Sequence, residues 1–177
     1  MPHTPTLRRS RVDRTRSRNN IYHPQHNTMS TTPPTLPTRL AEIKEDFLAL
    51  SAADRLQYLL EFSQNLPPLP EQYTDHPDLL ERVEECQSPV FIVPEIINGT
   101  VHLHATAPAE APTTRGFAAI LVDGLTGLTV AEALEVPADY PQSLGLAAAV
   151  SPLRVRGMTG ILTRVRRRLR ELEATPE

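Results

Sequence analysis

Residues 90–106 read VFIVPEIINGTVHLHAT, with two β-branched and aromatic runs on either side of Asn98-Gly99. A tight primed turn needs positive φ at both central positions, and Asn-Gly is among the dipeptides that adopt it most readily. The pattern therefore predicts a β-hairpin with strands at residues 90–97 and 100–106. This hairpin forms the start of a small antiparallel sheet.

The segment before the hairpin has helical spacing. Apolar residues recur every three or four positions in two stretches, first at Leu40, Ile43, Phe47 and Leu50, then at Leu56, Leu59, Leu60 and Phe62. Ser51 followed by Asp54 resembles an N-cap with an acid in the first turn, so the second helix begins there. Prolines in residues 66–70 end it. We expect the two helices to form a hairpin packed on the sheet, and residues 79–83 to form a short strand or a turn of helix.

Three further helices are predicted after the hairpin. One runs from Pro112 to Asp123-Gly124, where glycine suits a C-terminal cap. Thr129 with Glu132 forms a capping-box pattern that starts a short helix. The last helix has one apolar face, formed by Met158, Ile161, Leu162, Val165 and Leu169. Its other face carries Arg164, Arg167 and Arg168, which we interpret as a solvated face rather than an RNA-binding surface because acids alternate with them and aromatic residues are lacking.

The chain of 177 residues with 40% hydrophobic content fits one domain with a tail. Helices that bracket a small antiparallel sheet indicate an α+β fold. We expect the domain at residues 36–173 and a disordered C-terminus at 174–177. Residues 1–35 are rich in polar residues and proline without apolar periodicity, which predicts a disordered tail. No apolar run approaches the roughly 18 residues of a membrane span, so no membrane association is expected.

Charge is divided unevenly along the chain. The 28 residues before Met29 carry six arginines and one acid, so the formal net charge of −3 leaves −8 for the rest. An acidic domain disfavours nucleic acid as the main ligand, because duplex binding depends on clustered Lys and Arg. The basic tail could be a transit peptide or a nucleic-acid arm. We favour the alternative that Met29 is the physiological start.

A single cysteine, Cys86, lies between an acidic polar loop and the first strand of the hairpin. One thiol makes no internal disulfide and holds neither an iron–sulfur cluster nor a four-sulfur zinc site. It is therefore a structural thiol or a thiol that does chemistry. The polar loop favours the second interpretation, because structural cysteines usually lie inside apolar elements and reactive ones at accessible positions.

Four separated blocks give this chain a resemblance to a known family. In chain order they are Cys86-Gln87-Ser88, Thr114-Arg115-Gly116-Phe117, residues 128–132 (LTVAE) and residues 151–158 (SPLRVRGM). Their order and spacing resemble those of SufE, the sulfur-acceptor protein that works beside a cysteine desulfurase, from about residue 36 to about residue 171. The resemblance implies a SufE/IscU-like α+β fold, in which a small antiparallel three-stranded sheet packs against several helices.

The resemblance also implies a function and partners. Cys86 would take persulfide sulfur from a SufS-type cysteine desulfurase, stimulate that enzyme and pass the sulfur to an iron–sulfur scaffold. The chain would then be an activator and carrier rather than a stand-alone enzyme. It would hold no cofactor or metal of its own, since pyridoxal phosphate belongs to the desulfurase. We expect a cytoplasmic protein, because one unpaired thiol and no signal-peptide pattern indicate a reducing compartment. We also expect a monomer or weak homodimer.

The acidic flank of Cys86 affects its expected reactivity. Only a thiolate is nucleophilic, and Glu84 and Glu85 should raise the pKa of the thiol. The commoner family pattern has a glycine before the cysteine, so Glu85 also limits the backbone conformations of the loop. Our hypothesis is that Cys86 reacts slowly alone and becomes reactive when the desulfurase supplies positive charge and orientation.

Four further residues are site candidates beside Cys86, and the resemblance suggests that one of them, Arg154, lies near the Cys86 loop or the partner surface. Gln87 and Ser88 continue the family tripeptide. Arg154 matches an arginine that precedes the family's last helix, and it would either stabilise a thiolate or persulfide anion or be a surface charge. Arg115 stands where lysine is more common in the family, and a partner-facing charge and a solvated helix start are equally open.

Alternatives of other classes remain at this stage. A rhodanese-like donor could supply the sulfur, or the chain could be a stand-alone thiol enzyme that reduces a peroxide. His102 and His104 alternate on a strand and so share a face, but they lack the spacing that makes a zinc site convincing, and we expect exposed strand histidines. A cluster-binding scaffold is disfavoured by the single cysteine.

Overall fold

The computed structural model describes residues 35–175, so the predicted tail at residues 1–35 lies outside the described residues except for its last position. In chain order the elements are α1 (Thr38–Ala49), α2 (Ala52–Gln64), α3 (Glu71–Thr74), η1 (Pro77–Leu79), β1 (Glu81–Arg82), β2 (Phe91–Ile97), β3 (Thr100–Thr106), α4 (Pro112–Leu125), α5 (Val130–Glu135), α6 (Tyr140–Ser143), η2 (Leu146–Ala148) and α7 (Pro152–Ala174). The predicted C-terminal tail thus begins on the last residue of α7.

The hairpin forms as predicted. β2 and β3 pair antiparallel with Ile97 opposite Thr100, and the two turn residues Asn98 and Gly99 have φ of 51° and 78°. β1 adds a short edge strand beside β2, so the sheet has the order β1-β2-β3. For residues 79–83 a short strand or a turn of helix was expected, and the structure contains part of each. Leu79 ends a 3₁₀ turn, and β1 follows at Glu81–Arg82. The prediction of an α+β fold with a three-stranded antiparallel sheet is confirmed.

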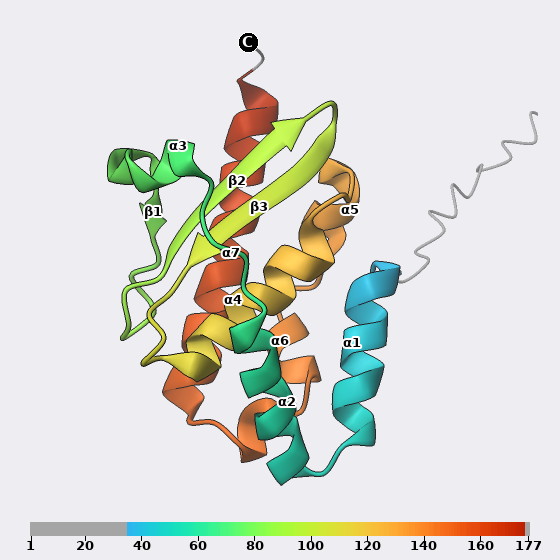
Figure 1. The fold of residues 1–177 in the computed structure, drawn as a ribbon. Coiled ribbons are helices and arrows are strands. Elements are labelled where there is room, and N and C mark those ends of the chain that lie inside the picture. Colours follow the sequence, from blue (N-terminus) through green and yellow to red (C-terminus); the bar gives the residue numbers. More distant parts are fainter. Residues whose placement is uncertain (1–34, 176–177) are drawn as a thin grey trace, which may run out of the picture. The chain divides into compact units, whose positions relative to one another are not determined.

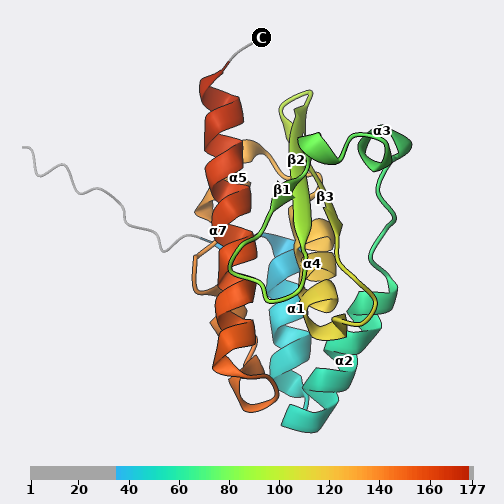
Figure 2. The same ribbon diagram turned by 90° about the vertical axis from the view of Figure 1, so that its left-hand side faces the viewer.

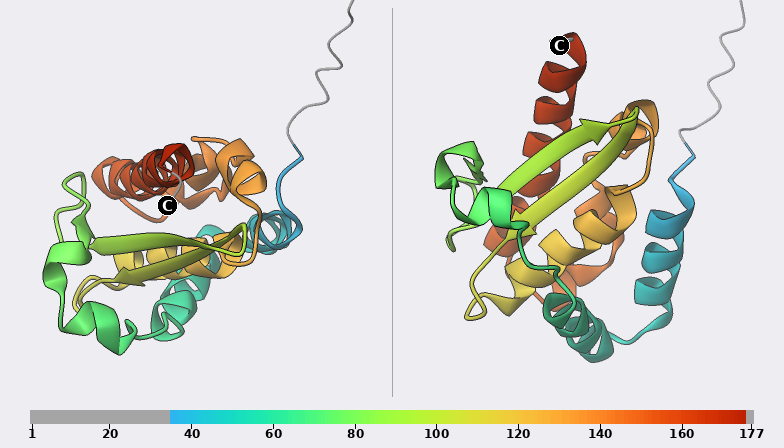
Figure 3. Two further views of the ribbon diagram at one scale, coloured as in Figure 1. Left: turned by 90° about the horizontal axis from the view of Figure 1, so that it is seen from above. Right: turned by 45° about the horizontal axis from the view of Figure 1, so that its top comes forward.

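One face of the sheet packs against helices. On β3 the buried residues Val101, Leu103 and Ala105 alternate with half-buried ones, as expected of a strand with one face in the core. α7 packs against β2, and α4 and α5 pack against β3. Seen from above and from the side, α7 forms a layer on one side of the hairpin (Figures 2 and 3).

The prediction that the first two helices pack on the sheet is wrong. Their main partner is α4, which lies between α2 and the hairpin (Figure 1), and α2 also contacts η2. Gly116 in α4 allows the close approach: a Cβ built there would lie 2.2 Å from the backbone oxygen of Leu59 in α2. α4 thus packs on the sheet, and α2 packs on α4 rather than on the sheet itself.

The prediction that α4 ends near Asp123-Gly124 is right to within one residue, but the prediction that Gly124 caps the helix is wrong. The helix continues to Leu125, and the chain turns at Gly127, whose φ is +90°. Gly124 has another role, because a Cβ built there would lie 2.1 Å from Cδ2 of Leu40 in α1. It is a packing glycine inside the helix rather than a cap.

Local capping signals are confirmed. The Ser51 side chain accepts a hydrogen bond from the amide of Asp54, and Thr129 and Glu132 form a reciprocal capping box. The apolar face predicted for the last helix is buried in α7. Among residues 35–175, no helix has both the length and the apolar composition to cross a membrane.

Candidate functional site

Cys86 lies in the loop that joins β1 to β2. The amide of Val83 donates to the carbonyl of Val90 at 2.9 Å and closes the base of the loop, and the amide of Cys86 donates to the carbonyl of Val83 at 3.2 Å. This turn directs the thiol inward, where the residue is only 7% exposed. The loop position agrees with the prediction, but the thiol is not at an accessible position.

The loop rests on a strip of α7 that has little side-chain volume. The Cys86 thiol donates to the carbonyl of Gly157 at 3.6 Å. A Cβ built at Gly157 would lie 3.2 Å from Sγ of Cys86, and one built at Gly160 would lie 2.6 Å from Cβ of Glu85. The two glycines therefore allow the loop to lie directly on the helix backbone (Figure 2).

The surroundings of the thiol favour its protonated form. Burial raises the pKa of Cys86 to about 11, the negative charge of Glu85 adds to the increase, and the positive charge of Arg164 opposes it. The prediction that the acidic flank raises this pKa is right for Glu85, although burial is the larger cause. At neutral pH the resting protein thus holds a neutral, poorly nucleophilic thiol.

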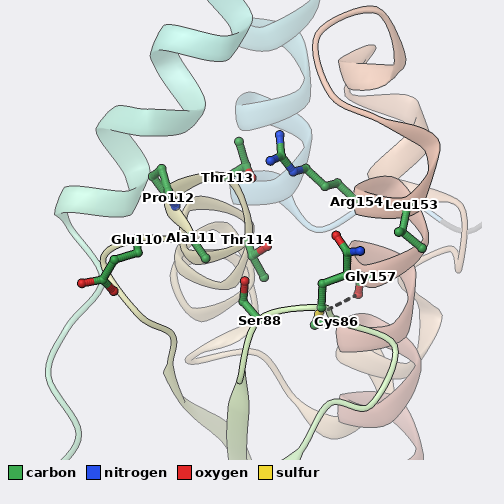
Figure 4. Close-up of a pocket in the computed structure, with 11 residues that line it drawn as sticks. Cys86, Ser88, Glu110, Ala111, Pro112, Thr113, Thr114, Leu153, Arg154 and Gly157 are labelled. Carbon is green, nitrogen blue, oxygen red and sulfur yellow. Dashed lines mark hydrogen bonds between the residues drawn. The ribbon is translucent and has the colours of Figure 1, made fainter.

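A pocket of about 180 Å³ opens beside Cys86. It is lined by residues from three segments: Cys86, Gln87 and Ser88 of the loop, Glu110 to Thr114 at the start of α4, and Leu153, Arg154 and Gly157 of α7. In Figure 4 the Arg154 side chain extends over the pocket from the first turn of α7. Loop, α4 and α7 thus meet at the thiol.

The pocket is lined by one basic residue, Arg154, and one acidic residue, Glu110. Its walls also include the first turns of α4 and α7, where the positive ends of the helix macrodipoles favour negative charge. Arg154 adds a full positive charge, and in the described part of the chain its guanidinium makes no ion pair. A sulfur anion attached to Cys86 is small enough to enter this space.

The structure brings most of the predicted site residues together. Gln87, Ser88 and Arg154 all line the pocket beside Cys86. Arg115 does not: its guanidinium donates to the carbonyl of Ser63 at 2.9 Å and to that of Ala107 at 2.6 Å. These bonds tie α4 to the end of α2 and the end of the hairpin, which favours a structural role for Arg115.

Sequence reasoning missed the contact between the loop and Arg164. The Arg164 guanidinium donates to both carboxylate oxygens of Glu85, at 2.7 Å and 3.2 Å, and to Glu81 at 3.1 Å. The prediction of a solvated face is therefore wrong for Arg164, whose side chain is 23% exposed. The available signal was the spacing of Gly157, Gly160 and Arg164, which share one helix face.

The histidines are engaged with neighbours on the sheet. His104 lies 2.8 Å from Glu95 through its Nε2 atom, and its ring contacts that of Tyr73. His102 lies 3.5 Å from the hydroxyl of Thr100. Within residues 35–175, no three His, Cys, Asp or Glu side chains come close enough to hold a metal ion.

Comparison with protein families matches residues 41–169 of this chain to the SufE model, described as an Fe-S metabolism associated domain. The match covers more than half of the chain and includes every residue of the Cys86 pocket.

Known relatives agree with this match. An uncharacterized SufE-like protein of Mycobacterium tuberculosis is 49% identical over 144 residues, which cover 81% of this chain and 99% of the relative. SufE-like protein 1, chloroplastic/mitochondrial, of Arabidopsis thaliana is 30% identical over 80% of this chain, but this chain covers only 38% of that protein. The solution structure of a hypothetical protein from Thermus thermophilus is similar with a TM-score of 0.71 and 35% identity, and the match covers 80% of this chain and 100% of that one.

Proposed function

Because the chain belongs to the SufE family, which is associated with Fe-S metabolism, we propose that Cys86 accepts persulfide sulfur from a SufS-type cysteine desulfurase and carries it to an iron–sulfur scaffold. The observation that supports this most is the position of the thiol. The chain's one cysteine lies on a loop beside a pocket that Arg154 helps to line, at the meeting point of three segments.

The transfer is a thiol–persulfide exchange. The thiolate of Cys86 attacks the terminal sulfur of the donor persulfide, a new S–S bond forms at Sγ, and the donor's S–S bond breaks. The donor cysteine leaves as a thiolate and takes up the proton that Cys86 released. The two sides balance without an external oxidant or reductant, because the sulfane sulfur keeps its oxidation state as it moves.

The resting geometry requires the partner's help. A cysteine that is 7% exposed, with a thiol pKa of about 11, neither reaches a donor nor ionises readily at neutral pH. Docking of the desulfurase would move the loop away from α7 and place the thiol in a more solvated and more positive setting, where its pKa falls. Removal of product sulfur in this way accelerates the desulfurase.

After transfer, the loop would return with a persulfide in place of the thiol. The outer sulfur would then occupy the pocket, and Arg154, which lines the same pocket, would supply a positive charge that favours the persulfide anion. A single cysteine that makes no internal disulfide favours a reducing compartment such as the cytoplasm. Pyridoxal phosphate stays with the desulfurase, and this chain works as a monomer or weak homodimer.

The Cys86→Ser variant tests the proposal, because a serine oxygen accepts no sulfane sulfur by exchange. We expect the native protein to stimulate turnover of a SufS-type desulfurase and to gain about 32 daltons by non-reducing intact mass, the mass of one sulfur. The variant should gain no mass. Since the chain has one cysteine, added sulfur identifies its own site.

Other outcomes would contradict the proposal. Equal stimulation by the native protein and Cys86→Ser would remove the persulfide from the mechanism. A mass gain with a rhodanese and thiosulfate, but none with the desulfurase, would favour a sulfurtransferase relay instead. Circular dichroism of both proteins is the control, since Sγ makes only one weak hydrogen bond and the substitution should leave the fold intact.

A further inference from the structure

The Cys86 loop is held on α7 by one charged contact. In the described part of the chain, the hydrogen bonds and ion pairs of residues 84–89 are few. Glu84 pairs with Arg82 on the same strand segment, Cys86 bonds within the loop and weakly to Gly157, and Glu85 pairs with Arg164. Only the last of these ties the loop to α7 with charge.

Arg164 is positioned to hold the loop and its base together. Two of its nitrogens bind the carboxylate of Glu85, and Nη1 binds Glu81 of β1. Bidentate Arg–carboxylate contacts are among the stronger side-chain pairs, and side-chain exposures of 23% for Arg164 and 39% for Glu85 leave the pair only partly screened. The contact lies one residue from the thiol that must leave its site.

Two glycines of α7 explain why the ion pair between Glu85 and Arg164 matters for holding the loop. Gly157 and Gly160 lie beneath Cys86 and Glu85 and offer no side chain to hold the loop. One face of α7 carries Gly157, Gly160 and Arg164, at steps of three and four residues. Along this face the loop contacts helix backbone at the two glycines and the guanidinium at Arg164. Within the described residues, the pair of Glu85 with Arg164 is therefore the one charged contact between the loop and α7, beside the burial of Cys86 itself.

We propose that Arg164 is a positioning residue that latches the Cys86 loop closed through Glu85 and Glu81, and so sets how often Cys86 becomes accessible. The role of the latch in sulfur transfer depends on the function proposed above. The latch itself depends only on the geometry of this chain. Its release would be the step that a docked partner accelerates.

Alkylation of Cys86 in the protein alone tests the latch. With iodoacetamide at pH 7.5, Arg164→Gln should react about threefold to tenfold faster than the native protein, the range expected for losing one partly exposed charge-assisted pair. Electrostatics alone predicts the opposite sign, because the positive charge of Arg164 lowers the pKa of Cys86 and its removal would make the thiolate scarcer. The direction of the change therefore separates the two explanations.

Arg168→Gln is the matched control. Arg168 lies on the same helix and pairs with Glu81 and Glu171 but not with Glu85, so its loss removes one positive charge and one Glu81 contact while the contact between Arg164 and Glu85 remains. Arg164→Lys keeps the positive charge but loses the bidentate contact with Glu85, so its alkylation rate should lie between those of the native protein and Arg164→Gln. A rate for Arg164→Gln at or below that of Arg168→Gln would overturn the proposal.

The dependence of the alkylation rate on ionic strength is a second test of the latch. Raising ionic strength from about 0.1 M to about 1 M shortens the Debye length from about 10 Å to about 3 Å and weakens a partly exposed pair. Alkylation of the native protein should accelerate, whereas that of Arg164→Gln should change little. Equal salt dependence would contradict the latch. Neither assay contains a desulfurase, so the latch and the carrier function can fail separately.

Discussion

Gly116→Ala should destabilise the folded protein by about 3 kcal/mol, at the upper end of the range for overpacking a core. A Cβ at this position of α4 would lie 2.2 Å from the backbone oxygen of Leu59 and 3.2 Å from its carbonyl carbon. A backbone carbonyl inside α2 has no rotamer to change, so α2 must shift away from α4. The gain in helix propensity from glycine to alanine, about 1 kcal/mol, is too small to offset this.

Gly124→Ala is the matched comparison for this prediction. It lies on the same helix and gains the same propensity, but the atoms nearest its built Cβ are Cδ2 and Cγ of the buried Leu40, at 2.1 and 2.7 Å, and a side chain can change rotamer whereas a backbone carbonyl cannot. We expect thermal unfolding to show a loss of about 10 °C for Gly116→Ala and a clearly smaller loss for Gly124→Ala. Equal losses would contradict the view that a backbone contact fixes the spacing of α2 and α4.

The features of the fold that were predictable are local ones. The Asn98-Gly99 turn, the Ser51 cap and the Thr129 capping box each depend on a few adjacent residues, and each forms as predicted. The apolar face of α7 was predictable for the same reason, since the period of a helix is visible within two turns. Such patterns can be interpreted because the local preferences of these residues agree with the structure that the whole chain adopts.

The partners of the helices were not predictable. Nothing in the periodicity of α1 and α2 distinguishes a sheet from another helix as the surface they cover. The deciding residues are Gly116 and Gly124, which have no side chain and so add nothing to an apolar pattern. Gly124 resembles a cap because a glycine near a helix end and a glycine in a helix contact look alike in sequence.

Part of the candidate site was predictable and part was not. Gln87 and Ser88 adjoin Cys86 in sequence, and the resemblance to SufE pointed to Arg154; all three line the pocket. The direction of the thiol depends on Gly157, which is 71 positions away in the chain. Arg164 was missed because its helix face looks polar, and only the fold shows that Glu85 lies against it.

A closed resting state suits a sulfur carrier in physical terms. Thiolate character and exposure set the rate at which a cysteine is oxidised, and the thiol of Cys86 has little of either. Burial therefore protects the carrier between transfers, and the cost is that the loop must open before each one. The Glu85–Arg164 pair and the raised pKa of Cys86 are two contributions to the same closed state.

The alkylation rate of Cys86 in the folded protein should keep rising with pH beyond 9 and level off only near 11. Burial raises the pKa of the closed thiol from its ordinary value of 9.0 to about 11. The open thiol and the unfolded chain keep the ordinary value, so their thiolate fraction levels off above pH 9. In the folded protein, opening between pH 9 and 11 releases a proton, and the open population grows with pH.

The direction of this pH effect depends on whether the closed or the open loop binds the thiol proton more tightly. The closed loop has the raised pKa, so its stability relative to the open loop is complete below pH 9 and is lost as pH rises toward about 11. The shift of about two units corresponds to about a 100-fold change in the opening equilibrium, since each unit is a factor of ten. The ratio of unfolded to folded alkylation rates should therefore shrink by about that factor across this window.

Intact mass after timed exposure to iodoacetamide measures both rates, with the unfolded chain prepared in urea as the reference. Circular dichroism at each pH is the control, because global unfolding at high pH would also expose the thiol. A folded protein whose rate levels off near pH 9, as the unfolded chain does, would mean that Cys86 ionises as a solvated thiol. The loop would then rest open in solution, and neither burial nor Arg164 would limit access to the sulfur.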